Sequence, residues 1–94
     1  MIPFVRVAQV QNLLATYNTL ARAERALLPS NWFHSCLNVM SYVEALRNEG
    51  HHFAAQERVL LRDLYCTLEC AYFALGAFEA VGIVKMNCQF VLGI

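Results

Sequence analysis

One uncharged stretch limits what this chain can fold into more than any other feature. Residues 70–78 include no charged side chain, and residues 64–94 include only Glu69, Glu79 and Lys85. A helix that is apolar on all sides is normally buried on all sides. A chain of 94 residues has little interior in which to surround such a helix. We therefore expect this stretch to be buried against a partner.

Length and composition agree with that expectation. Charged residues make up 15% of the chain, against about 25% in a typical soluble domain, and hydrophobic residues make up 59%. Such a chain has enough apolar surface to fold, which excludes intrinsic disorder. Its length predicts one domain over residues 1–94.

Apolar residues recur at helical spacing through most of the chain. We expect a first helix to begin between Val5 and Gln11 and to end before Pro29, which disfavours the helical conformation in its predecessor. Ser30 or Asn31 then offers an N-cap to a second helix.

The second helix is expected to stop at Gly50, because glycine takes a left-handed conformation without strain. Its predicted buried stripe consists of Cys36, Val39, Met40, Val43 and Leu46.

A third helix is expected to start near residues 52–54 and to stop at Gly76. Its predicted buried stripe consists of Leu61, Leu64, Leu68, Ala71 and Leu75. A fourth helix is expected from Phe78 to Phe90, with Gly82 marking either a close crossing with another helix or a break.

Short connections between helices favour antiparallel neighbours. The sequence therefore predicts an all-α fold, a small antiparallel bundle or helical-hairpin array of about four helices. Trp32 and Phe33 are expected to close one end of the bundle as a lid, with an exposed aromatic anchor as the alternative.

Charge argues against one class of partner. Seven Lys and Arg balance seven Asp and Glu, so the formal net charge is zero. No basic field exists to attract a phosphate backbone, and we expect no nucleic-acid partner. A net charge near zero also gives little protection against self-association.

The four cysteines are predicted to be reduced and buried. A disulfide scaffold needs a secretory context, and residues 1–6 show no basic segment ahead of a long apolar core. We therefore expect an intracellular, reducing compartment, cytoplasmic in the first instance. Mitochondrial is the minor alternative, because residues 1–23 contain Arg6 and Arg22, no acid and helical periodicity.

Cys66 and Cys70 lie four residues apart and share one helix face. Two ligands from a helix and two from a loop suit zinc, which makes His51 and His52 the accompanying candidates. No CxxC pair is present, so we expect neither a metal nor a cofactor. A zinc-binding or thiol-redox regulatory protein is the alternative that these four residues leave open.

Catalytic motifs are absent from the sequence. It contains no GxSxG, no HExxH and no phosphate-binding glycine loop. We therefore predict that the chain is not an enzyme.

Residues 64–83 are mostly apolar and long enough to raise the question of a membrane span. They contain Glu69 and Glu79, and an acid at the centre of a spanning helix costs about 2.5–3.5 kcal/mol. We expect a buried helical hairpin here, with a membrane-associated helical subunit as the alternative.

Residues 65–79 carry a second pattern, made of Tyr65, Leu68, the pair Ala71-Tyr72, Gly76 and Phe78. This run resembles the first helix and turn of a tetratricopeptide repeat. The resemblance implies that Ala71 lets two helices approach, that Gly76 forms the turn, and that the scaffold binds protein. It covers no other part of the chain.

The sequence thus favours a non-enzymatic helical protein-interaction module. It would be an obligate homo-oligomer or a small subunit of a larger assembly. Residues 90–94 are also apolar, as in an excised domain or a tail docked into a partner. The expected interface consists of Tyr65, Tyr72, Phe73, Phe78, Phe90 and Val91.

Overall fold

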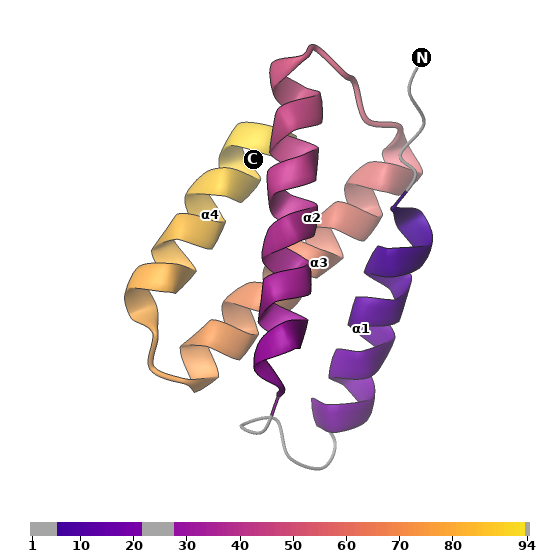
Figure 1. The fold of residues 1–94 in the computed structure, drawn as a ribbon. Helices are drawn as coiled ribbons and strands as arrows, with labels where there is room; N and C mark the ends of the chain where they lie inside the picture. Colours follow the sequence, from indigo (N-terminus) through magenta and orange to yellow (C-terminus); the bar gives the residue numbers. More distant parts are fainter. Residues whose placement is uncertain (1–5, 22–27, 94) are drawn as a thin grey trace.

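Four α-helices account for most of the computed structural model, which describes residues 6–21 and 28–93 (Figure 1). The helices are α1 (Val7–Ala21), α2 (Ser30–Asn48), α3 (Ala55–Ala74) and α4 (Phe78–Leu92). No residue of the two described ranges lies in a strand. The predicted all-α bundle is confirmed.

The helices surround one core with α2 and α3 on opposite sides of it. In Figure 1, α2 lies in front, α3 crosses behind it, and α1 and α4 flank the pair. Consecutive helices run in opposite directions, and α1 and α4 do not contact each other. The α3–α4 hairpin forms the most extensive contact between two helices.

The connection between α2 and α3 differs from the expectation. The two helices are antiparallel, but each packs more extensively against α1 or α4 than against the other. The connection spans residues 49–54, with a turn at 49–50 and no regular structure at 51–54. This length of chain carries α3 across the end of the bundle instead of folding it back beside α2.

Two glycines end their helices as predicted. Gly50 follows α2 with a φ of +85°, and Gly76 follows α3 with a φ of +73°, both in the left-handed region. The predicted N-cap of α2 is wrong, because the helix begins at Ser30 and no side chain caps it. At the start of α3 the Ala54 backbone N–H donates to Glu57 Oε1 at 2.8 Å.

The buried stripe predicted for α2 is confirmed at every position. In α3 four of the five predicted residues are buried, but Leu75 lies in the turn after the helix and is 53% exposed. In α1 the apolar spacing places Val10, Leu13 and Tyr17 in the core. The expected extension of this helix toward Pro29 falls on residues 22–27, outside the described ranges.

Aromatic rings close the end of the bundle where α1 finishes and α2 starts. Trp32 is buried and lies 5.7 Å from Tyr17 and 5.1 Å from Phe33, between ring centroids. Phe33 in turn lies 4.9 Å from Tyr72 of α3. Trp32 and Phe33 therefore form the predicted lid, and it joins three helices.

Gly82 does not interrupt α4, which is helical from Phe78 to Leu92. A Cβ atom placed on Gly82 would meet nothing within 4 Å. The prediction of a break is therefore wrong, and no helix of the described chain crosses α4 at this glycine.

Candidate functional site

Exposed apolar side chains gather on one part of the molecule. Of the large hydrophobic residues exposed in the described ranges, Leu37 lies on α2 and Val59 near the start of α3, away from the turn between α3 and α4. The others are 47% to 70% exposed. We call them the hairpin surface, and they are Phe73, Leu75, Phe78, Ile83, Met86 and Phe90.

The turn of the hairpin supplies one half of this surface. The rings of Phe73 and Phe78 lie 5.3 Å apart between centroids and at 67°, an edge-to-face arrangement. Leu75 lies between them in the turn that Gly76 makes possible. Three apolar side chains therefore meet solvent where α3 passes into α4.

The outer side of α4 supplies the other half. Ile83, Met86 and Phe90 follow helical spacing along one exposed flank of α4, whereas Val84 and Val91 are buried. A shallow groove of about 290 Å³ runs beside them toward α2, and it is lined by Glu44, Ile83, Met86, Asn87 and Phe90.

The polar edge of that groove comes from α2. The Arg47 guanidinium lies 5.7 Å from the centroid of the Phe90 ring, within range of a cation–π contact. The hairpin surface therefore has an apolar centre and a charged rim on this side.

The predicted interface residues fall into an exposed group, a buried group and one half-buried residue. Phe73, Phe78 and Phe90 are exposed on the hairpin surface. Tyr65 and Val91 are buried in the chain's own core, so their assignment to an interface is wrong. The remaining residue of the set, Tyr72, is half-buried against Phe33 of the lid.

Ile83 and Met86 belong to the hairpin surface but were not expected there. Their only signal in the sequence is the 3–4 spacing that they share with Phe90. In an almost uncharged helix, polar residues do not mark which apolar stripe faces outward.

A partly buried polar relay links three helices beside this groove. The Tyr65 hydroxyl donates to Asn87 Oδ1, and Asn87 Nδ2 donates to Glu44 Oε2. The relay links α3, α4 and α2 through three side chains. Burial raises the pKa of Tyr65, with further contributions from Cys88 and Glu44. The phenol therefore stays protonated and keeps its role as donor.

The cysteines differ from their prediction in part. All four are free, and Cys36 and Cys88 are buried as expected, but Cys66 and Cys70 are exposed. Burial raises the pKa of Cys36 to about 12. Burial followed by Glu69 also raises the pKa of Cys66 and of Cys88. A raised pKa lowers the thiolate fraction, whereas reactive cysteines have a depressed pKa.

The four candidate metal ligands do not converge. Cys66 lies eleven residues beyond the start of α3, which places it about 16 Å along the helix from Ala55. His51 and His52 precede that start, and the His51 ring packs edge-on against Phe53 at 4.8 Å between centroids. Within residues 6–21 and 28–93, no three His, Cys, Asp or Glu side chains form a group that could hold a metal ion.

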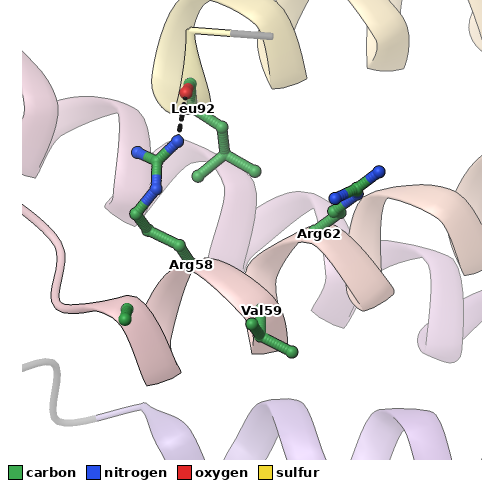
Figure 2. A pocket seen from close by; sticks show the side chains of 5 residues that line it. Arg58, Val59, Arg62 and Leu92 are labelled. Carbon is green, nitrogen blue, oxygen red and sulfur yellow. Dashed lines mark hydrogen bonds between the residues drawn. The ribbon is translucent and has the colours of Figure 1, made fainter.

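Arg58 joins the first turn of α3 to the end of α4, as Figure 2 shows. Its Nη2 donates at 2.5 Å to the carbonyl oxygen of Leu92, one of the last carbonyls of α4. Such carbonyls lack partners in the helix and carry its negative dipole end, which a cation stabilises.

A hollow of about 230 Å³ beside this bond is lined by Ala55, Arg58, Val59, Arg62 and Leu92 (Figure 2). It is smaller than the roughly 300–1,000 Å³ of small-molecule sites. The contact that Arg58 makes is its bond to the Leu92 carbonyl, which fastens the end of α4 to the start of α3.

In the part of the chain that the structure describes, no helix is long and apolar enough to cross a membrane. The fold and surface together define a small four-helix bundle with an apolar face on its C-terminal hairpin. Comparison with known proteins found no matching family model, no matching curated protein and no matching solved structure. The resemblance of residues 65–79 to a tetratricopeptide repeat stays a prediction.

Proposed function

We propose that this chain is a non-enzymatic helical module that associates with protein through the hairpin surface. One observation carries the proposal. The uncharged run 70–78, whose composition calls for burial, is largely exposed in the single chain, including Phe73, Leu75 and Phe78. Residues 70–78 therefore have the composition of a protein core but lie on the surface of the single chain.

The size of the hairpin surface supports the proposal. At roughly 200 Å² for a fully exposed side chain of this size, its six residues present on the order of 700 Å² of mostly apolar area. The largest apolar patch on a typical monomer is about 300–600 Å² and is often functional. An exposed apolar area of this order supports association with a partner protein.

The native mass of the chain tests the proposal. We expect the purified chain, or the chain in extracts of the cells that make it, to sediment well above 10.7 kDa. Met86→Glu places a charge at the most exposed residue of the hairpin surface and is expected to return the chain to 10.7 kDa.

A matched control separates surface chemistry from added charge. Asn38→Glu adds the same charge at an exposed position of α2 and is expected to leave the native mass unchanged. A native mass of 10.7 kDa for both the purified chain and the chain in cell extracts would overturn the proposal. Equal effects of Met86→Glu and Asn38→Glu on the native mass would overturn it as well.

A further inference from the structure

Gly82 lies at the middle of the exposed side of α4. Residues three and four positions away on the same helix face are Phe78, Glu79, Lys85 and Met86, and all of them are exposed, as is Gly82 itself. A glycine inside a helix lowers helix stability relative to alanine. Its usual compensation is a close approach by another element, and no atom of the described chain provides one.

We infer that a second copy of this chain packs its α4 across Gly82, antiparallel and related by a two-fold axis through that residue. This inference rests on the proposed function, because it names the partner that covers the hairpin surface. A missing side chain at the crossing point lets two helix backbones approach closely. In a two-fold contact each residue meets a residue equally far from the axis on the other side.

That register matches opposite charges. Three residues before Gly82 is Glu79, and three residues after it is Lys85. In the antiparallel crossing, Glu79 faces the partner's Lys85, and the symmetry repeats the pair. Within one chain, no hydrogen bond or ion pair joins either residue to the described remainder, so both charges are free to form these pairs.

The same register matches apolar side chains. Four residues before Gly82 is Phe78, and four residues after it is Met86, which are 63% and 70% exposed. In the crossing, Phe78 meets the partner's Met86, and the flexible thioether suits the aromatic edge. Apolar pairs thus flank the glycine, and ion pairs border them.

The exposed apolar area is of the order that a dimer needs. Standard interfaces bury about 800 Å² on each partner. The hairpin surface exposes on the order of 700 Å² in all, of which the crossing covers Phe78 and Met86 directly. The formal net charge of zero adds no repulsion between identical copies.

Charge reversal tests the register. Glu79→Lys alone places like charges opposite each other twice in the dimer, and so does Lys85→Glu. Each variant alone is expected to raise the dimer Kd about tenfold. A single exposed ion pair is weak, but each variant replaces both ion pairs of the dimer with like-charge pairs. An equimolar mixture restores both pairs and is expected to form heterodimers at the wild-type Kd, as is the doubly reversed chain alone.

Gly82→Gln tests the close approach. Glutamine favours a helix and meets open space in the single chain, so helical content by circular dichroism is expected to stay at or above the wild-type value. The same side chain obstructs the crossing, and the dimer Kd is expected to rise at least a hundredfold. Ala45→Gln, on the exposed side of α2, is the control that leaves the Kd unchanged.

Sedimentation equilibrium over a concentration series gives these Kd values. Two results would overturn the crossing and leave the proposed function standing. One is a dimer Kd that charge reversal does not change. The other is an equimolar mixture of the two variants whose Kd stays above the wild-type value. A purified chain that stays at 10.7 kDa also overturns it, and the native mass in cell extracts then decides the proposed function separately.

Discussion

The indole Nε1–H of Trp32 donates a hydrogen bond to the backbone carbonyl oxygen of Leu13, with 3.0 Å between nitrogen and oxygen. The bond joins the first turn of α2 to the middle of α1. Because Trp32 is buried, its N–H has no water to bond in place of this carbonyl. The lid is therefore fixed by one polar bond as well as by ring packing, and that makes it testable.

Trp32→Phe keeps an aromatic ring in the lid but removes the hydrogen bond to Leu13. We expect it to lower the free energy of unfolding by about 1–2 kcal/mol, for the lost bond and the smaller ring. Trp32→Ala, which also empties the site, is expected to cost about 3–5 kcal/mol. Urea unfolding followed by far-UV circular dichroism measures both. Equal costs for the two variants would show that the ring retained in Trp32→Phe does not stabilise the lid, and an unchanged stability of Trp32→Phe would contradict the role of the hydrogen bond.

Asn87→Ala removes the central member of the polar relay. The Tyr65 hydroxyl and the Glu44 carboxylate then lose their partners, and we expect a loss of about 2 kcal/mol in the free energy of unfolding. Asn38→Ala, exposed on α2, is the control and is expected to cost less than about 0.5 kcal/mol. A double-mutant cycle with Tyr65→Phe is expected to be non-additive, because both variants break the same bond. Additive costs would contradict a coupled relay.

The sequence was sufficient for the helices because their signals are local. The stripe from Cys36 to Leu46 in α2 follows the period of an α-helix, and Gly50 and Gly76 end helices through their own conformational freedom. Such features need only neighbours within one or two turns. The same reasoning gave the aromatic lid, because Trp32 and Phe33 follow a proline at the start of a helix.

The rest depends on contacts between distant parts of the chain. The hydrogen bond from Arg58 to Leu92 spans 34 positions and the one from Asn87 to Glu44 spans 43, so no local sequence pattern predicts them. Nor could the sequence tell Tyr65, which is buried, from Phe73, which is exposed. Both lie in a helix with few charges, and its outward side became visible only once the neighbouring helices were in place.

Arg58→Met keeps the aliphatic stem of the side chain but removes its bond to the Leu92 carbonyl. We expect the free energy of unfolding to fall by about 1 kcal/mol, because the last carbonyls of α4 lose a charged donor. The loss is expected to shrink at high salt, which screens the interaction between the charge and the helix dipole. Arg62→Met, one turn along α3, is the control, since Arg62 makes no hydrogen bond or ion pair within the described ranges. Equal effects of the two variants at low salt would refute the fastening role.

Cys36→Val tests the buried thiol through the dependence of stability on pH. Burial raises the pKa of Cys36 from 9.0 to about 12, so between these values the thiol ionises in the unfolded chain and stays protonated in the folded one. The unfolded state then binds fewer protons, and stability falls as pH rises, by about 1.4 kcal/mol per unit for this group. Relative to wild type, Cys36→Val is expected to remove that slope between pH 9 and 11. Val43→Ala, which destabilises the same stripe but keeps the thiol, is expected to retain it. Parallel curves for wild type and Cys36→Val would show that Cys36 is not the group responsible.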